Sequence, residues 1–274
     1  MSMRRIAFGG LAAWLMLTAL PAFAAMRETP VDWTVGSQRF SGVLVYDDAG
    51  GKRPGLVMVP NWKGVNASAV EKGKRLAGKD YVVLVADVYG SGVRPASDAE
   101  AGKLAGALKA DPATLRTRIA KAVDVLKAQA GKAPLDAAKI GAVGYCFGGT
   151  TVLELARSGA QLAGIVTLHG NLATPEPAKA GVVKTPLLVL NGGADRYVPT
   201  AEIEGFWKEM DAAGADWQFV SFSGAVHCFA EPDANSGPGC QYDARAAKRA
   251  YRMLHDFFAE RFAATEHASA PVAR

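Results

Sequence analysis

The sequence is poor in the residues that build metal centres, with 3 cysteines and 4 histidines among 274 residues. Cys228 and Cys240 have no second pair at zinc-finger spacing, and the histidines lie far apart, so we expect no metal site. No G-x-x-x-x-G-K-[ST] or G-x-G-x-x-G motif follows a predicted strand, which argues against the common glycine-rich nucleotide sites. We therefore expect no cofactor.

Clusters of one charge are also missing. The formal net charge is +5, and the basic residues are scattered along the chain. This pattern gives no support for nucleic-acid binding. The apolar run at residues 6–20 is shorter than the roughly 20 residues that a membrane span requires.

The first residues have the pattern of a cleavable secretory signal. Arg4 and Arg5 precede the apolar run, and Ala22-Phe23-Ala24 gives the A-x-A pattern of a cleavage site. We predict cleavage after Ala24, which removes residues 1–24 and two positive charges, from +5 to +3. The mature protein is then expected to be periplasmic or secreted, without stable membrane association. An uncleaved anchor is the alternative.

Half of the residues are hydrophobic, enough for one substantial core. Residues 31–35 and 40–46 alternate around Gly36-Ser37, which predicts an antiparallel hairpin. Nearly unbroken apolar runs predict parallel strands covered on both faces, at residues 55–60, 81–86, 140–144, 164–168 and 186–190, with a further strand at 217–222. Helical patterns lie between and after them, including residues 112–126, 147–158 and 243–262. The prediction is one doubly wound, mostly parallel α/β domain at residues 25–262, followed by a disordered tail at 263–274.

The stretch GYCFG at residues 144–148 has the spacing of the G-x-S-x-G turn, with cysteine in place of the nucleophilic serine. Gly144 and Gly148 allow the strand and the following helix to approach closely. The N-terminus of that helix favours a thiolate at Cys146. A buried structural cysteine is the alternative interpretation.

A cysteine nucleophile needs a base, and the base needs a group that orients it. In α/β-hydrolases the chain order is nucleophile, acid, histidine. Asp195 and His227 follow the predicted strands at 187–190 and 217–222, so both fit this order. His169 precedes the acid and is interpreted as a packing or loop residue. Asp87 precedes Cys146 and is interpreted as a residue that fixes its loop.

Through these motifs the sequence resembles the dienelactone hydrolase family, a cysteine branch of the α/β-hydrolases. The matching stretches are VGYCFGG at 143–149, NGGADRYVP at 191–199, AVHCFAEP at 225–232, MVPNWKGVN at 58–66 and ADVYGSGVRP at 86–95. They span the mature domain from about residue 56 to the last helix. The resemblance implies an α/β-hydrolase fold.

The resemblance also implies a mechanism. Cys146 would be the nucleophile, His227 the base and Asp195 the orienting acid, with an oxyanion hole formed by the backbone amides of Phe147 and Trp62. The expected reaction is hydrolysis of a small-molecule ester or lactone through an acyl-enzyme, with thioesters as neighbouring substrates. A degenerate hydrolase fold that acts in binding or thiol redox chemistry is the alternative. The sequence does not specify the oligomeric state.

Three positions depart from the family pattern. Asn61 stands where well-known members carry a glutamate, and Glu231 replaces one of two arginines that hold the substrate carboxylate. Arg94 is a displaced candidate for the other arginine. Because a carboxylate repels anions, we predict a neutral or larger ester or lactone as substrate. Trp62, Tyr89 and Tyr145 are predicted to line the pocket, with core packing as the alternative for Trp62 and Tyr89.

Cys228 and Cys240 flank a loop rich in glycine and proline. In an oxidising compartment such a pair can form a disulfide that holds the segment carrying His227. Two free thiols, or a second reactive thiol at Cys228, are the alternatives.

Overall fold

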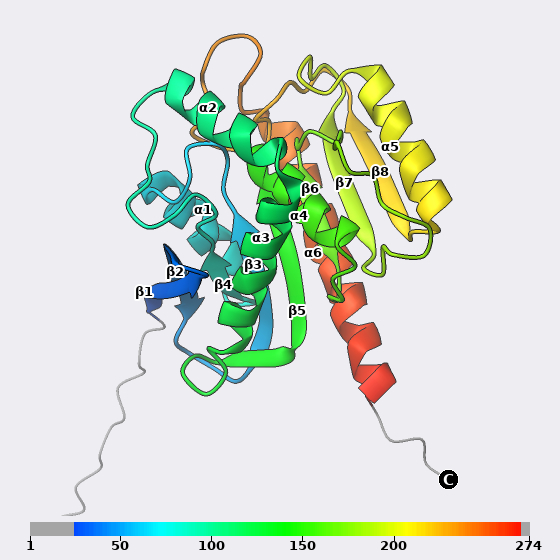
Figure 1. Cartoon of the computed structure of the whole chain (residues 1–274). Coiled ribbons are helices and arrows are strands. Elements are labelled where there is room, and N and C mark those ends of the chain that lie inside the picture. Colours follow the sequence, from blue (N-terminus) through cyan, green and yellow to red (C-terminus); the bar gives the residue numbers. More distant parts are fainter. Residues whose placement is uncertain (1–24, 270–274) are drawn as a thin grey trace, which may run out of the picture.

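The computed structural model describes residues 25–269, so the predicted signal peptide and the last five residues lie outside the described part. Its centre is an eight-stranded sheet in the order β1-β2-β4-β3-β5-β6-β7-β8 (Figure 1). The strands are β1 (Met26–Val35), β2 (Gln38–Asp47), β3 (Arg53–Val59), β4 (Val82–Val85), β5 (Leu135–Tyr145), β6 (Ile165–Leu168), β7 (Leu187–Gly192) and β8 (Trp217–Phe222). Neighbours from β4 to β8 are parallel, whereas β2 pairs antiparallel with both β1 and β4. The predicted fold class is confirmed.

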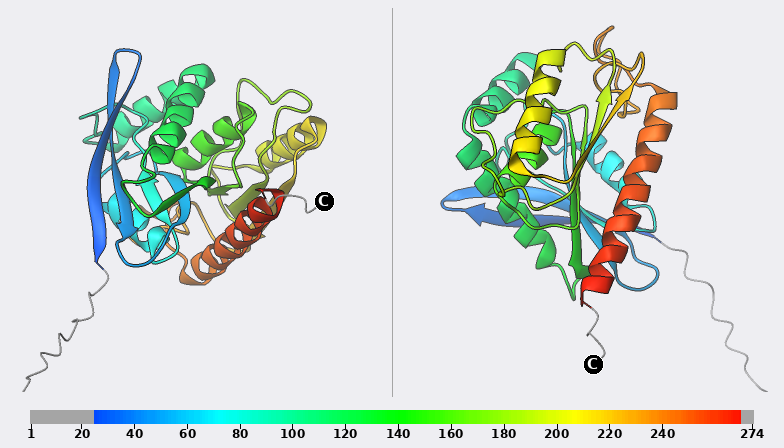
Figure 2. Two further views of the ribbon diagram at one scale, coloured as in Figure 1. Left: turned by 90° about the horizontal axis from the view of Figure 1, so that it is seen from below. Right: turned by 90° about the vertical axis from the view of Figure 1, so that its right-hand side faces the viewer.

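Helices cover both faces of the sheet. They are α1 (Ala67–Ala77), α2 (Asp98–Lys109), α3 (Pro112–Lys127), α4 (Phe147–Arg157), α5 (Thr200–Ala213) and α6 (Ala244–Ser269). One hydrophobic core holds the inward residues of α2, α3, α4 and α5, and a second holds those of α1 and α6. Figure 2 shows α5 and α6 on opposite sides of the sheet. None of the described helices is long and apolar enough to cross a membrane.

The predicted hairpin is confirmed at the β1 edge of the sheet. Val35 pairs with Gln38, so Gly36 and Ser37 form a two-residue turn. Gly36 has a φ of 56°, a conformation that glycine adopts without steric cost. Across the hairpin, the buried rings of Trp33 and Phe40 stack with their centroids 5.9 Å apart. This packing fixes the register of the edge ribbon.

The start of α3 follows from its sequence. The Asp111 side chain accepts a hydrogen bond of 3.0 Å from the Thr114 amide, and Pro112 occupies the first helical turn. Both features stabilise a helix N-terminus, because they satisfy or remove amides without an intrahelical partner. The helix then buries Leu115, Ile119 and further apolar residues against the sheet.

The C-terminal helix is longer than predicted. It continues to Ser269, so the predicted disordered tail at residues 263–274 is wrong for its first seven residues, 263–269. Ala263 and Ala264 extend the helix at low conformational cost, and the sequence has no glycine or proline from 244 to 269. The Thr265 hydroxyl also donates to the Arg261 carbonyl at 3.0 Å, four residues earlier.

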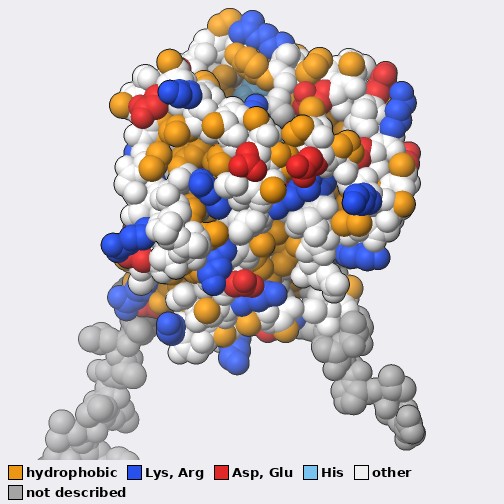
Figure 3. Space-filling model, in the orientation of Figure 1, with side chains coloured by type: hydrophobic (Ala, Val, Ile, Leu, Met, Phe, Trp, Pro, Cys, Tyr) orange, Lys and Arg blue, Asp and Glu red, His pale blue; other side chains and the backbone are white. Residues whose placement is uncertain are grey.

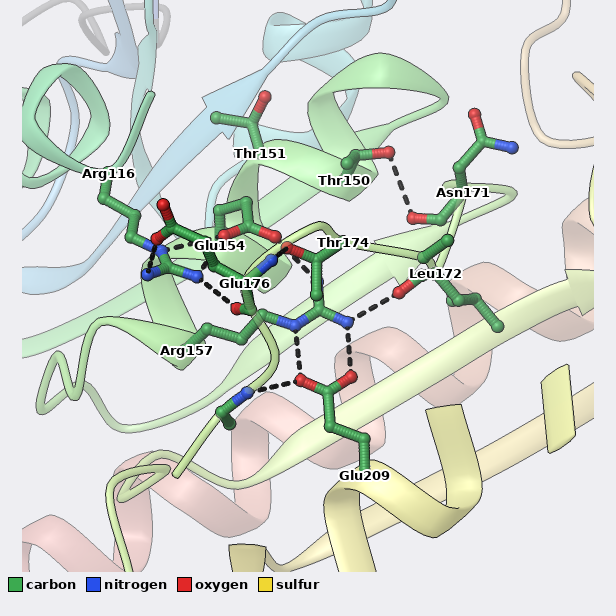
Figure 4. A network of polar contacts seen from close by, with 12 residues as sticks. Arg116, Thr150, Thr151, Glu154, Arg157, Asn171, Leu172, Thr174, Glu176 and Glu209 are labelled. Atoms are coloured by element: carbon green, nitrogen blue, oxygen red, sulfur yellow. Dashed lines mark hydrogen bonds and ion pairs between the residues drawn. The ribbon is translucent and has the colours of Figure 1, made fainter. Parts of the chain in front are cut away.

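A buried ion-pair network anchors α4, the helix that follows the cysteine turn (Figure 4). Arg157 contacts Glu154 at 2.9 Å and binds Glu209 of α5 through two hydrogen bonds of 2.8 Å each. Arg116 of α3 binds the other oxygen of Glu154. Arg157 also donates to the Leu172 carbonyl, which ties the loop after β6 to the same network. The network therefore joins three helices and a loop around α4.

Glu154→Gln is expected to lower the free energy of unfolding by about 3 kcal/mol, because it removes the buried negative charge that Arg157 and Arg116 share. Urea unfolding would measure this change. Glu260→Gln is the matched control, since Glu260 is an exposed partner of Arg261, and its expected cost is within about 0.5 kcal/mol. Equal losses for the two variants would contradict a stabilising role for the network.

Candidate active site

Cys146 lies at the sharp turn between β5 and α4 that the glycine spacing predicted. Its φ is 52°, a strained backbone conformation for a residue with a Cβ. A Cβ on Gly144 would lie 2.0 Å from the Gly148 carbonyl oxygen, and one on Gly148 would lie 2.1 Å from that of Val59. Only glycine fits at either position, and the turn holds the cysteine side chain above the sheet.

The structure brings together the three residues predicted as nucleophile, base and acid. His227 Nε2 lies 3.1 Å from Cys146 Sγ, and His227 Nδ1 lies 2.7 Å from Asp195 Oδ2. The three side chains come from the loops that follow β5, β7 and β8. Figure 3 shows a histidine side chain in a hollow of the surface at the top of the molecule. Because these loops all follow carboxyl ends of parallel strands, they meet at one edge of the sheet.

The acid is fixed by backbone contacts. Asp195 is 6% exposed, and its second oxygen accepts a hydrogen bond of 2.9 Å from the Tyr197 amide. The amide of Ala194 donates to the Ala225 carbonyl at 2.8 Å, which ties the acid loop to the histidine loop. Asp195 therefore has little freedom to turn away from His227.

The surroundings of His227 favour its protonated form. Burial alone lowers its pKa, but the hydrogen bonds and charges of Asp195 and Cys146 raise the pKa from 6.5 to about 10. At neutral pH an imidazolium then faces the sulfur at 3.1 Å. The contact places a positive charge beside the sulfur of the proposed nucleophile.

The raised pKa of His227 predicts a specific dependence of stability on pH. A group with a higher pKa in the folded state stabilises the fold fully below its unfolded pKa. That stabilisation is lost as the pH rises from 6.5 toward the folded pKa of about 10. The difference in unfolding free energy between the native protein and His227→Gln is expected to shrink over this range. Urea titrations at several pH values would measure it, and a constant or growing difference would contradict the assignment.

The two backbone amides predicted for an oxyanion hole have no partner in the described part of the chain. Phe147 is the first residue of α4, and neither its amide nor that of Trp62 donates a hydrogen bond to a described residue. Tyr89 connects the two residues: its hydroxyl donates to the Trp62 carbonyl at 2.9 Å, and its ring stacks on Phe147 at 5.4 Å. Burial and the charge of Cys146 raise the pKa of Tyr89 well above its usual range. The hydroxyl of Tyr89 thus stays a proton donor.

Asp87 has the loop-fixing role predicted for it. Its carboxylate accepts hydrogen bonds from the amides of Ser41, Tyr89 and Gly90 at 2.9 to 3.2 Å. Arg94 belongs to the same assembly, since it donates to the Val93 carbonyl at 2.7 Å and lies 3.8 Å from Asp87. These contacts give no support to the prediction that Arg94 holds a substrate carboxylate.

Tyr145 does not line the pocket, so that prediction is wrong. The side chain is fully buried, and its hydroxyl lies 2.9 Å from the hydroxyl of Tyr251 in α6. Successive residues of a strand point to opposite faces of the sheet. Tyr145, directly before Cys146, therefore packs in the core beneath α6.

The prediction that Glu231 faces and repels the substrate is also wrong. Its side chain is 2% exposed, and one oxygen accepts a hydrogen bond of 2.6 Å from Asn61 Nδ2 and lies 3.2 Å from Lys72 Nζ. Burial raises the pKa of Glu231, and the Lys72 charge opposes this rise. The carboxylate is neutralised within the protein. The sequence interpretation missed Lys72, although its position three residues after Ala69 and four before Leu76 puts it on the buried stripe of α1.

His169 is confirmed as a packing residue. It is 1% exposed, and its ring meets the rings of His227 and Phe229 edge-on, with centroids 5.1 and 5.4 Å away. Burial, and then the charge of His227, lower the pKa of His169 well below its usual range. His169 is therefore a neutral neighbour of the His227 imidazolium.

The predicted disulfide is confirmed. Cys228 and Cys240 are bonded, with Cα atoms 5.0 Å apart, and Cys146 is the free cysteine of the described residues. The Gln241 amide, next to the bridge, donates to the His227 carbonyl at 3.1 Å. The bridge thus holds the loop that carries the base.

Replacing both bridge cysteines by serine is expected to lower the free energy of unfolding by about 3 kcal/mol, because the loop of the unfolded chain is no longer closed. Thermal and urea unfolding of Cys228→Ser/Cys240→Ser would measure the loss. Unreduced native protein is the reference, and reduction with dithiothreitol should reproduce the effect. An unchanged unfolding midpoint would contradict this role of the bridge.

The sheet order, the cysteine turn and the chain order Cys146, Asp195, His227 define an α/β-hydrolase. Within that class the chain belongs to the dienelactone hydrolase family, whose sequence model matches residues 40–262. Membership of this family identifies the chain as a carboxylic ester hydrolase.

Several known proteins are similar to this chain. A solved dienelactone hydrolase-like promiscuous phosphotriesterase, P91 from metagenomic libraries, is 36% identical with a TM-score of 0.80, and the match covers 87% of this chain and 99% of P91. The solved structure named m3DLH is also 36% identical, with a TM-score of 0.81 and the same coverage of both chains. The protein K02A2.1 of Caenorhabditis elegans is 32% identical over 155 residues, 54% of this chain and 95% of that protein.

Proposed function

We propose that the chain hydrolyses neutral carboxylic esters and lactones through a Cys146–His227–Asp195 triad. The observation that carries the proposal is the continuous contact from sulfur to imidazole to carboxylate, at 3.1 and 2.7 Å. In this arrangement the base can move a proton, and the acid holds the tautomer that the base needs.

The first half-reaction forms the acyl-enzyme. The Cys146 thiolate attacks the ester carbonyl carbon, and the amides of Phe147 and Trp62 stabilise the tetrahedral oxyanion. The intermediate collapses with cleavage of the C–O bond, and the leaving alkoxide takes the proton from His227. Each oxyanion donor is expected to be worth about 100-fold or more in rate.

The second half-reaction releases the acid. His227, now neutral, removes a proton from water as the water attacks the thioester carbonyl. The second tetrahedral intermediate expels the Cys146 thiolate and leaves the imidazolium of the resting state. Thioester substrates would enter the same cycle, because the acyl-enzyme is itself a thioester.

A neutral substrate is supported by the two positions at which related members carry arginine. Arg94 is engaged by backbone carbonyls, and Glu231 is a buried anion paired with Lys72. Neither position offers a free cation for a bidentate clamp on a carboxylate. Comparing kcat/KM for a neutral aryl acetate and an anionic lactone tests this, and a clear preference for the anionic lactone would contradict it.

Steady turnover of p-nitrophenyl acetate by the mature protein tests the function itself. Turnover that is lost in Cys146→Ala supports the proposal. Stoichiometric alkylation of Cys146 with no ester turnover would instead support a degenerate fold that acts in binding or thiol chemistry. A panel of esters, lactones and thioesters would then define the substrate class.

A second activity, hydrolysis of phosphotriesters, is favoured by the 36% identity to the phosphotriesterase P91. The same thiolate would attack phosphorus and expel an aryloxide, and the same amides would face the phosphoryl oxygen. Release of p-nitrophenol from paraoxon over many turnovers tests this activity. Release limited to one equivalent would show inhibition and not turnover.

We further propose that the protein acts in the periplasm or outside the cell. The support is the predicted signal at residues 1–24 together with the Cys228–Cys240 bridge, because disulfides persist in oxidising compartments. N-terminal sequencing of the extracytoplasmic protein is expected to begin at Ala25. Recovery of the uncleaved chain in the cytoplasm would contradict the proposal.

A further inference from the structure

Glu231 links two loops of the proposed active site. It lies in the loop that carries His227, where its amide closes a turn by donating to the Cys228 carbonyl at 2.9 Å. Its carboxylate reaches across to Asn61, at the end of β3, with a hydrogen bond of 2.6 Å between residues 170 positions apart. The side chains thus connect the base loop to the loop that carries Trp62.

Asn61 in turn shapes the loop around Trp62. Its side-chain oxygen accepts a hydrogen bond of 3.0 Å from the Lys63 amide, and its carbonyl accepts one of 2.9 Å from the Gly64 amide. Gly64 has a φ of 70°, which closes the turn. Trp62 lies inside this turn, so the direction of its amide depends on how the Asn61 side chain is held.

A buried cation, Lys72, stabilises the Glu231 carboxylate that accepts the hydrogen bond from Asn61. Lys72 lies 3.2 Å from Glu231 and 2.6 Å from Asp233, with side-chain exposures of 7%, 2% and 54% respectively. A lone buried carboxylate would be costly, and the lysine offsets that cost. A hydrogen bond from an amide to an ionised carboxylate is also stronger than a neutral one.

We propose that Asn61 and Glu231 are positioning residues for the oxyanion hole: their bond sets the Trp62 amide relative to the Cys146–His227 pair. The inference rests on the proposed function, because it assumes an acyl transfer at Cys146. Neither residue touches the reacting atoms in this account. Their effect on the rate is exerted through the backbone of the turn at Trp62.

Asn61→Leu keeps the volume of the side chain and removes both of its hydrogen-bonding groups. Its kcat for p-nitrophenyl acetate is expected to fall about 10- to 100-fold, because a misplaced donor loses most of its effect on the transition state. Its KM is expected to stay within about 3-fold, since the ester binds before the oxyanion forms. Alkylation of Cys146 by iodoacetamide, which develops no oxyanion, should keep its native rate.

An exchange of the two groups provides a rescue test. Asn61→Asp brings two carboxylates together and should lower kcat at least as much as Asn61→Leu. Adding Glu231→Gln restores an amide–carboxylate pair with the roles reversed, and kcat should recover to within about 3-fold of Glu231→Gln alone. Asp233→Asn is the matched control, because it removes the other carboxylate of Lys72 without touching Asn61, and its kcat should be native.

Three results would overturn the inference. Iodoacetamide alkylation that falls in parallel with kcat in Asn61→Leu would mean that the pair acts on the sulfur. A native kcat with only a lowered melting temperature would mean a purely structural role. If kcat does not recover in the double variant, the hydrogen bond between residues 61 and 231 does not position the Trp62 amide. With Cys146→Ala inactive, these results leave the proposed function intact, whereas full turnover by Cys146→Ala would end both.

Discussion

Replacing Cys146 by alanine is expected to lower kcat/KM for p-nitrophenyl acetate by about 10,000-fold or more, because the members of such a triad act as one unit. The variant loses the atom that forms the acyl-enzyme, while the amides of Phe147 and Trp62 remain in place. The residual rate should therefore be small but above that of the uncatalysed reaction. Stopped-flow assays of p-nitrophenol release would measure the native rate. Long-time spectrophotometric assays would measure the residual rate of the variant.

Cys146→Ser is the matched control for this change. It keeps a nucleophilic atom at nearly the same position, but a hydroxyl ionises far less readily than a thiol. Its turnover should lie between that of the alanine variant and that of the native protein. Both variants should unfold at nearly the native temperature, because the side chain is only partly buried. Native-like turnover in Cys146→Ala would contradict the proposed nucleophile.

The second large effect is expected for Asp195→Asn, with a loss of about 1,000- to 10,000-fold in kcat, the size known for this change in a serine protease triad. In the native protein the Tyr197 amide donates a hydrogen bond of 2.9 Å to Asp195 Oδ1. The asparagine oxygen of the variant can still accept this bond. The amide group then faces His227 Nδ1, where a donor forces the ring proton onto Nε2. That tautomer points a proton at Cys146 and cannot accept one.

The pH dependence separates this explanation from simple damage to the fold. Because Asp195 raises the pKa of His227 in the native protein, the asparagine variant should have a lower His227 pKa. NMR titration of His227 would measure its pKa, and assays of kcat on the same samples would measure the loss of activity. A variant with less than about a 10-fold loss in kcat would contradict the role of Asp195.

Local sequence patterns predict much of the fold and of the candidate site. The turn at Gly36-Ser37, the cap at Asp111 and the cysteine turn at Gly144–Gly148 each depend on neighbouring residues, so the sequence alone specifies them. The positions of Asp195 and His227 followed from a rule about strand ends. All of these features are present in the structure.

Contacts between distant segments were the ones that sequence reasoning missed. The sequence predicts a Glu231 that faces the ligand, but its partners Asn61 and Lys72 lie more than 150 positions away along the chain. No local pattern shows that a carboxylate so placed will be neutralised. Tyr145 is a different case, since alternation along β5 already puts its side chain on the face opposite Cys146. The end of α6 was missed because alanine-rich sequence was interpreted as a tail.

The central claim, a covalent intermediate on Cys146, is tested most directly by trapping it. The native protein is mixed with p-nitrophenyl acetate, quenched in acid within the first turnover, digested and analysed by mass spectrometry. We expect one acetyl group on the peptide that contains Cys146, and no acetyl group on the corresponding peptide of Cys146→Ala treated in the same way. An acetyl group on another side chain that forms and decays at the rate of turnover, with Cys146 unmodified, would contradict it.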